Sequence, residues 1–144
     1  MAIDLTPYAD AVNSAFSEGH FAVVATASED GTPDVGFKGS LMVYDKDHLA
    51  YWERTRGEHL ANLRLNPHVS VLYFNRERGK YLRLHGEAIL HEDGPIRDQI
   101  MARVVAPELG YDPERKGIGV LIRVERLNEA FGGVSQQREG TQAA

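Results

Sequence analysis

Residues 51–67, YWERTRGEHLANLRLNP, contain the pattern that decides the fold of this chain. An aromatic strand is followed by a basic turn at 54–56, and a short helix then begins at Gly57 and stops before Pro67. The first turn of a helix leaves backbone N–H groups without partners, and guanidinium groups bond phosphate oxygens in pairs. The turn is therefore a candidate phosphate site. The alternative is a solvated turn of exposed ion pairs, which are common and weak.

Upstream of this stretch, the residue pattern predicts one helix and three strands. Helical spacing of apolar residues indicates a helix over 7–18. Strands are expected over 21–27, 34–44 and 48–53, and the acidic-Gly turn at 29–31 joins the first two as a hairpin.

Downstream, the pattern predicts three more strands and one more helix. An apolar strand covers 69–74, a strand with plain period two covers 81–88, and the last strand covers 118–125. Between the last two, a helix begins at Gly94 and ends at Pro107. About six antiparallel strands joined mostly by hairpins favour a mainly β (α+β) barrel or sandwich, because closure hides the strand edges.

Length, charge and composition exclude several classes of protein. We expect a single domain over residues 1–144, with a flexible polar tail over 136–144. The chain has no cysteine, so it has neither a disulfide framework nor a thiolate metal site. Its net charge of -5 argues against nucleic acid as a partner. Because no apolar run approaches about 20 residues and the N-terminus does not read as a signal peptide, we expect a cytoplasmic protein with no membrane partner.

Two further kinds of site are not expected from the sequence. The six histidines share no ligand spacing, so no metal site is predicted. The chain also lacks a G-x-S-x-G nucleophile elbow, which makes a hydrolase a weak alternative.

The order of these parts carries a resemblance to a known family. The matching order begins with a strand, an acidic-Gly hairpin and a second strand that carries a lysine. It continues with an aromatic third strand, a basic turn, a helix that ends in Asn-Pro and an apolar strand. The most typical phrase is LRLNPHVSVLYF, at residues 63–74. Over residues 10–126 this resembles the FMN-binding split barrels related to pyridoxamine 5'-phosphate oxidase. The resemblance implies a six-stranded antiparallel split β-barrel with short flanking helices, which forms a homodimer and binds FMN at the dimer interface. It also implies hydride or electron transfer through the flavin, with the substrate and electron donor unassigned.

The resemblance places cofactor-binding residues by position and assigns no catalytic side chain. The second strand and the segment after the third strand would contact the flavin and its phosphate, Lys38 would lie near the N1 and O2 edge of the ring, and the fifth strand would add further contacts. The implied residues are Phe37, Lys38, Gly39, Ser40, Trp52, Glu53, Arg54, Thr55, Arg56, His59, Lys80 and Tyr81.

The chain departs from the oxidases at two places, and several alternatives stay open. Residues 57–59 read Gly-Glu-His where the oxidases carry Ser-Arg-Lys. The phosphate would therefore have to be bound by Arg54 and Arg56. The C-terminus lacks the Trp- and Arg-bearing segment of the oxidases, so we do not expect oxidation of pyridoxamine phosphate itself. The same fold could bind a deazaflavin or haem, or act as a non-enzymatic flavin-binding or interaction module. Trp52 could cover the cofactor or belong to the core, and Lys38 could be a surface lysine.

Overall fold

The computed structural model describes residues 2–129 and 133–140, and its strands form one antiparallel sheet. Within these residues there are eight strands: β1 (Ala22–Ala27), β2 (Pro33–Lys38), β3 (Met42–Val43), β4 (His48–Glu53), β5 (His68–Asn75), β6 (Lys80–His91), β7 (Ile118–Glu129) and β8 (Val134–Gln137). The helices are a 3-10 turn (Thr6–Tyr8), α1 (Ala9–Asn13), α2 (Glu58–Leu65), α3 (Gly94–Arg103) and α4 (Ala106–Gly110).

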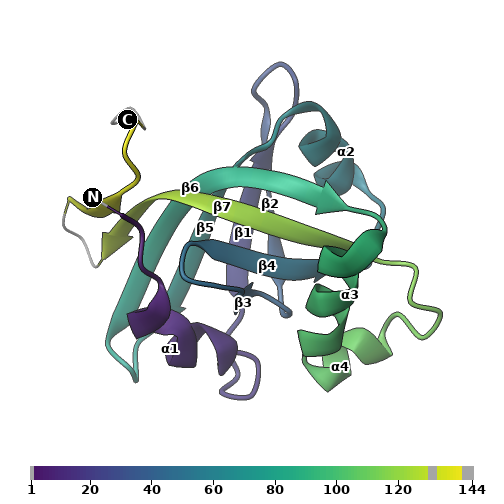
Figure 1. Cartoon of the computed structure of the whole chain (residues 1–144), viewed down its shortest axis with the longest axis horizontal. Helices are drawn as coiled ribbons and strands as arrows, with labels where there is room; N and C mark the ends of the chain where they lie inside the picture. Colours follow the sequence, from purple (N-terminus) through teal and green to yellow (C-terminus); the bar gives the residue numbers. More distant parts are fainter. Residues whose placement is uncertain (1, 130–132, 141–144) are drawn as a thin grey trace.

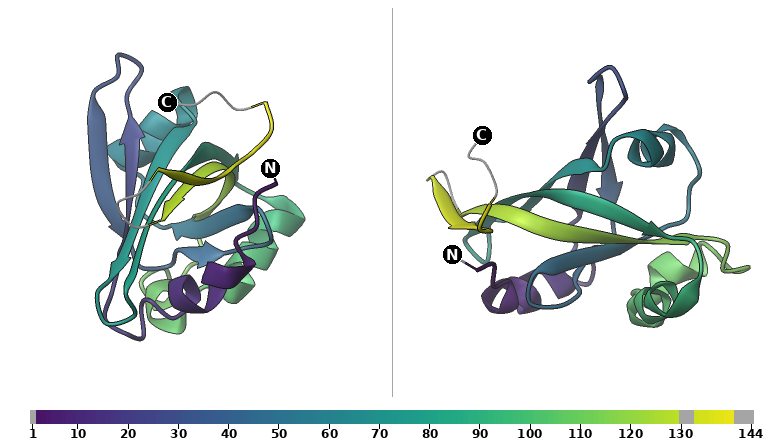
Figure 2. Two further views of the ribbon diagram at one scale, coloured as in Figure 1. Left: turned by 90° about the vertical axis from the view of Figure 1, so that its left-hand side faces the viewer. Right: turned by 45° about the horizontal axis from the view of Figure 1, so that its top comes forward.

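The sheet is curled into a half-barrel. Its strand order is β2-β1-β5-β6-β7-β4-β3, and β8 adds to β7 off this path. The two end strands, β2 and β3, follow each other in the chain and are joined by residues 39–41 alone. An extended connection of this length reaches at most about 14 Å. The two ends of the sheet must therefore lie close together, and the views in Figures 1 and 2 show the resulting curl.

The main core fills the inside of this curl. On β6, Leu82, Leu84 and Ala88 point inward, as the period-two pattern of this strand predicts. Val120 and Ile122 on β7 join the same cluster. Burying each large apolar side chain contributes roughly 1.5–3 kcal/mol, so the inward faces of these two long strands stabilise the sheet strongly.

A second, smaller core lies on the outside of β4. Helix α3 packs there, and its Ile100 contacts a cluster that includes Trp52 and Leu121. Strand β4 is therefore covered on both faces, and Leu49 to Glu53 are all buried. In Figure 1, α3 and α4 form a helical pair beside the end of β4. This packing places α4 next to the basic turn that follows β4.

The predicted N-terminal helix over 7–18 is shorter in the structure. It consists of the 3-10 turn followed by α1, which ends at Asn13. The side chain of Asn13 accepts the backbone N–H of Val43 at 2.8 Å, and Ser17 donates to the carbonyl of Ser14 at 2.9 Å. These polar side chains hydrogen-bond outside the helical ladder, as such residues do at helix ends. The segment after Asn13 is consequently a series of turns.

The predicted return strand over 34–44 is split in two. Its first part is β2, which starts at Pro33 and pairs with β1, and its second part is β3, which pairs with β4. The chain must cross from one end of the curled sheet to the other between these pairings, so a continuous strand is impossible. The sheet accordingly has more strands than the six predicted.

The predicted helix from Gly94 to Pro107 is also two elements. Helix α3 ends at Arg103, because Val104 and Val105 have extended backbones, and Pro107 lies in the first turn of α4. Proline is tolerated in a first turn, where its missing N–H would have no partner. Pro107 therefore begins a helix, and the prediction that it ends one is wrong.

The C-terminal segment forms one more strand than predicted. Residues 136 and 137, which the predicted tail includes, lie in β8 and pair with Leu127 and Arg126 of β7. Residues 141–144 of that tail lie outside the described residues.

Candidate functional site

A small pocket lies where β2 ends and β4 leads into the basic turn. It is lined by residues 37–40 and 52–55, which include eight of the twelve predicted site residues, together with Glu108 of α4. The pocket has a volume of about 70 Å³. The fold thus brings the end of β2 and the segment from Trp52 to Thr55 into one pocket.

A buried ion pair forms one wall of this pocket. The ammonium of Lys38 lies 3.0 Å from Oε1 of Glu53, and the two side chains are 11% and 1% exposed. The other carboxylate oxygen, Oε2, accepts the backbone N–H of Thr55 at 3.2 Å and its hydroxyl at 2.9 Å. The ammonium also lies 5.4 Å from the ring centroid of Tyr51. Lys38 is therefore held in place from two sides, and it is not a freely solvated surface lysine.

His59 lies behind this wall and does not line the pocket. Its Nε2 is 3.2 Å from the hydroxyl of Tyr51, while its buried Nδ1 has no hydrogen-bond partner among the described residues. Burial, and then the charge of Lys38, lowers the pKa of His59 below its ordinary value. Burial, and then the charge of Glu53, raises the pKa of Tyr51 well above its ordinary value. Both side chains are thus neutral near pH 7, and the Tyr51 hydroxyl can donate to His59.

The two arginines of the basic turn have separate partners. Nε of Arg54 lies 3.3 Å from Oε2 of Glu108, and its guanidinium lies 4.8 Å from the ring centroid of Tyr111. Arg56 points elsewhere and donates to the carbonyl of Lys116 at 2.8 Å. Only Arg54 lines the pocket. Within one chain, the two guanidinium groups therefore do not converge on a common point.

Trp52 belongs to the outer core. Its indole Nε1 donates to Asp112 at 2.9 Å, and the guanidinium of Arg97 lies 4.9 Å from its ring centroid. Gly117 lies against the indole so closely that a Cβ there would overlap the ring. Of the two roles considered for Trp52, the structure supports the core.

Lys80 and Tyr81 lie at the other end of the sheet. They begin β6, where Leu82 pairs with Glu129, whereas Glu53 pairs with Ile118 at the opposite end of β7. Lys80 is 3.7 Å from Glu129. A single chain thus does not bring these two residues to the pocket.

The outer face of β2, β1 and β5 carries exposed apolar side chains. Val35 and Phe37 of β2 are 67% and 75% exposed, and Leu72 and Phe74 of β5 are also exposed. The strand register places Val23 of β1 between Phe37 and Leu72. Phe37 also lines the small pocket, so the apolar face continues to the edge of that pocket.

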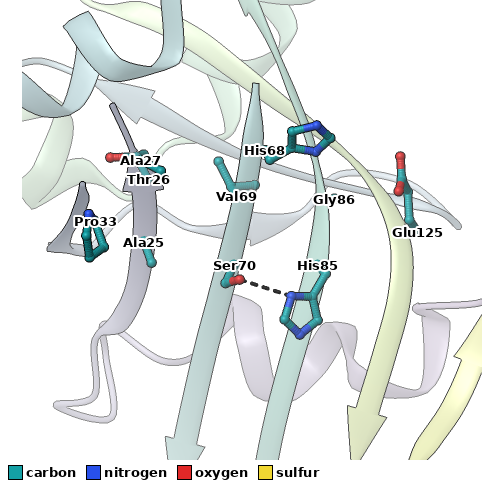
Figure 3. A pocket seen from close by; sticks show the side chains of 10 residues that line it. All are labelled: Ala25, Thr26, Ala27, Pro33, His68, Val69, Ser70, His85, Gly86 and Glu125. Carbon is teal, nitrogen blue, oxygen red and sulfur yellow. Dashed lines mark hydrogen bonds between the residues drawn. The ribbon is translucent and has the colours of Figure 1, made fainter. Parts of the chain in front are cut away.

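Figure 3 shows a larger hollow on the same face. It has a volume of about 350 Å³ and is lined by residues of β1, β5, β6 and β7 together with Pro33 at the start of β2. Within it, the hydroxyl of Ser70 lies 3.0 Å from Nδ1 of His85. Burial, and then the charges of Arg126 and Arg83, lowers the pKa of His85. The hollow thus adds polar groups, including the Glu125 carboxylate, to a largely apolar surface.

Glu108, Tyr111 and Asp112 were not predicted as site residues. They lie in or just after α4, more than 50 residues beyond Arg54 in the chain. No local pattern marks them. The packing of α3 on β4 brings Glu108 into the pocket, Tyr111 against Arg54 and Asp112 against the Trp52 indole. The turn before β4 similarly gathers Asp45, Asp47 and His48, whose ligand atoms lie within 4.8 Å of one another, although no metal spacing was seen there.

None of the helices in the described ranges is both long and apolar enough to cross a membrane.

A comparison with protein families identifies one family for this chain. The family model described as pyridoxamine 5'-phosphate oxidase matches residues 8–127. A solved structure of a proposed pyridoxamine 5'-phosphate oxidase from Lactobacillus delbrueckii is 26% identical, with 78% of this chain and 87% of that chain covered and a TM-score of 0.63. No curated protein gives a significant match.

Two more distant structures share the fold. An FMN-binding protein from Syntrophomonas wolfei is 11% identical, with 87% of each chain covered and a TM-score of 0.66. An F420 reductase is 18% identical, with 75% of this chain and 88% of that chain covered and a TM-score of 0.57. At these identities the likeness concerns the fold alone.

Proposed function

The chain belongs to the pyridoxamine 5'-phosphate oxidase family, and on that premise we propose that it is an FMN-binding flavoprotein that passes hydride or electrons through a flavin held between two copies of the chain. The observation that carries this proposal is the pocket between β2 and β4, because eight residues predicted for cofactor binding meet there.

The chemistry of the pocket fits an anionic, hydrogen-bonding ligand. The ammonium of Lys38 has three hydrogens, of which Glu53 accepts one, and Arg54 carries further donors. The carboxylate of Glu108 already lies beside Arg54. This contact supports the view that the place beside the Arg54 guanidinium suits acidic oxygens. We place the polar edge of the flavin at Lys38 and the acidic part of the cofactor toward Arg54.

The residues of this chain would bind and orient the cofactor. Glu53 would hold Lys38 in one position, so that its charge stabilises negative charge on the ring, as proteins commonly tune bound cofactors. Gly39 would allow a ligand to approach the backbone closely. When bound, the flavin itself would supply hydride and electron transfer at N5.

The size of the pocket supports a shared site. Ligand pockets usually have volumes of about 300–1,000 Å³, whereas this one has about 70 Å³. A second copy of the chain seated on the exposed apolar face would complete the pocket at Phe37, which belongs to both. In the same dimer, Lys80 and Tyr81 of one subunit would contact the flavin that lies in the pocket of the other subunit.

Cofactor binding can be tested directly. The purified protein, mixed with FMN, should quench flavin fluorescence with saturation, and Arg54→Ala should weaken binding by about 1.5–3 kcal/mol, the contribution of one charge-assisted hydrogen bond. Arg76→Ala, in the exposed turn after β5, is the matched control and should leave the affinity unchanged.

The same titration separates the alternatives. Deazaflavin F420 and haem should be titrated in parallel, since an F420 reductase shares the fold. If F420 or haem binds more tightly than FMN, that ligand becomes the proposed cofactor in place of FMN. Failure of all three ligands to bind would leave a non-enzymatic interaction module as the better description.

A further inference from the structure

We propose that Glu108 acts as an internal competitor of the ligand: its carboxylate occupies the place beside Arg54 that an acidic ligand group would take, and it must swing away when the ligand binds. This inference rests on the proposed function, since it concerns the same pocket. It makes Glu108 a residue that sets the affinity for anionic ligands, because only a ligand with an acidic group competes with its carboxylate for Arg54.

The Glu108 carboxylate lies within the pocket. Its side chain is 15% exposed and reaches from α4 across the pocket. One oxygen lies 3.3 Å from Nε of Arg54, and the other lies so close to Gly39 that a Cβ there would overlap it. The carboxylate thus fills the space between the Arg54 guanidinium and the Gly39 backbone.

The cations and carboxylates of the pocket balance in charge. Lys38 is paired with Glu53 and Arg54 with Glu108, so two cations are matched by two carboxylates. Because the cations are already neutralised, an incoming anion meets no excess positive charge. An anion that takes the place beside Nε of Arg54 must therefore displace a carboxylate that is already paired there.

The two carboxylates are not equally replaceable. Glu53 is 1% exposed and accepts three hydrogen bonds, and separating such a buried pair is costly. Among the described residues, Glu108 forms one ion pair, at 3.3 Å to an arginine that is 39% exposed, and ion pairs of this kind contribute little. Glu108 is therefore the carboxylate that a ligand can displace.

The surroundings of Arg54 and α4 would stay in place when Glu108 moves. The ring of Tyr111 lies 4.8 Å from the Arg54 guanidinium and would keep it aimed at the pocket. Just beyond α4, Asp112 accepts the Trp52 indole N–H and the backbone N–H of Gly117, at 2.9 and 2.7 Å. The change thus requires rotation of one side chain, with the helix fixed.

This arrangement discriminates between ligands by charge. A phosphate group replaces the Glu108 carboxylate with a stronger anion and keeps Arg54 paired. A neutral ligand has no group that competes for Arg54, so it leaves the Glu108 carboxylate in place. FMN and riboflavin, which differ by the phosphate, are accordingly the appropriate pair of probes.

The test compares Glu108→Gln with a matched control. Gln has the same shape as Glu without its charge, so E108Q should tighten FMN binding about tenfold, or about 1.4 kcal/mol, and change riboflavin binding by much less. Glu114→Gln is the control, because Glu114 lies six residues further along, is 71% exposed and pairs with Lys116. The titrations belong at low ionic strength, where charge effects are least screened.

The possible outcomes are separable from those of the proposed function. Equal gains for FMN and riboflavin, an unchanged FMN affinity in E108Q, or the same gain in E114Q would each overturn the role of Glu108. If no variant binds FMN, the proposed function fails, and pyrophosphate then serves as the probe. Thermal stabilisation by pyrophosphate that is larger in E108Q than in the wild type would still support the competitor, and equal stabilisation would reject it.

Discussion

Gly117 shows how one missing side chain permits the outer core. The indole of Trp52 lies against its Cα, and no other residue would leave this space open. Gly117→Ala should therefore destabilise the protein by about 1–3 kcal/mol, the usual cost of overpacking. Urea unfolding followed by Trp52 fluorescence measures this cost. Gly110→Ala, in α4 with open space around it, is the control and should be close to neutral; an equal loss there would contradict the packing argument.

The buried Lys38–Glu53 pair also contributes to the stability of the fold. Lys38→Met leaves the Glu53 carboxylate buried without its cation, and removing one partner of a buried pair costs about 3–5 kcal/mol. The double variant K38M/E53Q should recover part of this loss, because Gln still accepts the hydrogen bonds of Thr55. Denaturant unfolding of K38M, E53Q and the double variant, each compared with the wild type, measures the coupling. A K38M variant as stable as the wild type would show that the pair is not buried in solution.

At the scale of elements, Asp112 ties the segment after α4 to β4. Burial raises its pKa, but hydrogen bonds from the Lys116 backbone, the Trp52 indole and the Gly117 backbone outweigh this, and the net pKa of Asp112 lies below its ordinary value. The carboxylate therefore stabilises the fold above its unfolded pKa of about 3.9. This stabilisation is lost as the pH falls through the lower, folded pKa.

Asp112→Asn should consequently cost about 1–3 kcal/mol at neutral pH, the price of leaving buried donors poorly matched. The difference from the wild type should shrink in acid, as the wild-type carboxyl becomes protonated. Unfolding free energies between neutral pH and the acid limit of the fold measure this convergence. Asp98→Asn, on an exposed side chain of α3, is the control and should leave the unfolding free energy at neutral pH nearly unchanged. A constant deficit of D112N at all pH values would contradict the assignment.

At the scale of the whole molecule, the exposed apolar face of β2, β1 and β5 is the surface on which we expect two copies to meet. A stable interface buries about 1,200–2,000 Å², and a lysine at its centre would be desolvated without a partner. Val35→Lys should thus convert a dimer to a monomer, measured by size-exclusion chromatography with light scattering. It should also weaken FMN binding, if the flavin lies between the subunits.

Leu65→Lys is the control for this experiment. Leu65 is as exposed as Val35, but it lies at the end of α2, away from the strand face. It should leave the assembly state unchanged. A wild-type protein that is monomeric at high concentration would remove the basis for a site shared by two chains.

The sequence by itself determined the elements whose signals are local. The alternation of Leu82, Leu84 and Ala88, the hairpin turn at 29–31 and the helix between Gly57 and Pro67 all appear as predicted. Each depends on neighbours within a few residues, through side-chain period, turn chemistry or the backbone limits of proline. The order of these elements was enough to indicate the family, and with it the strands that meet at the pocket.

Only the tertiary structure decided what depends on distant segments. The predicted strand over 34–44 is interrupted after Lys38 because β2 and β3 lie at opposite ends of the curled sheet. Trp52 belongs to the core because α3 covers β4. Glu108 reaches Arg54 from more than 50 residues away in the chain. The distance of Lys80 from Lys38 is likewise set by the strand register. No local pattern encodes such long-range contacts, because they arise from the packing of the whole chain around two cores.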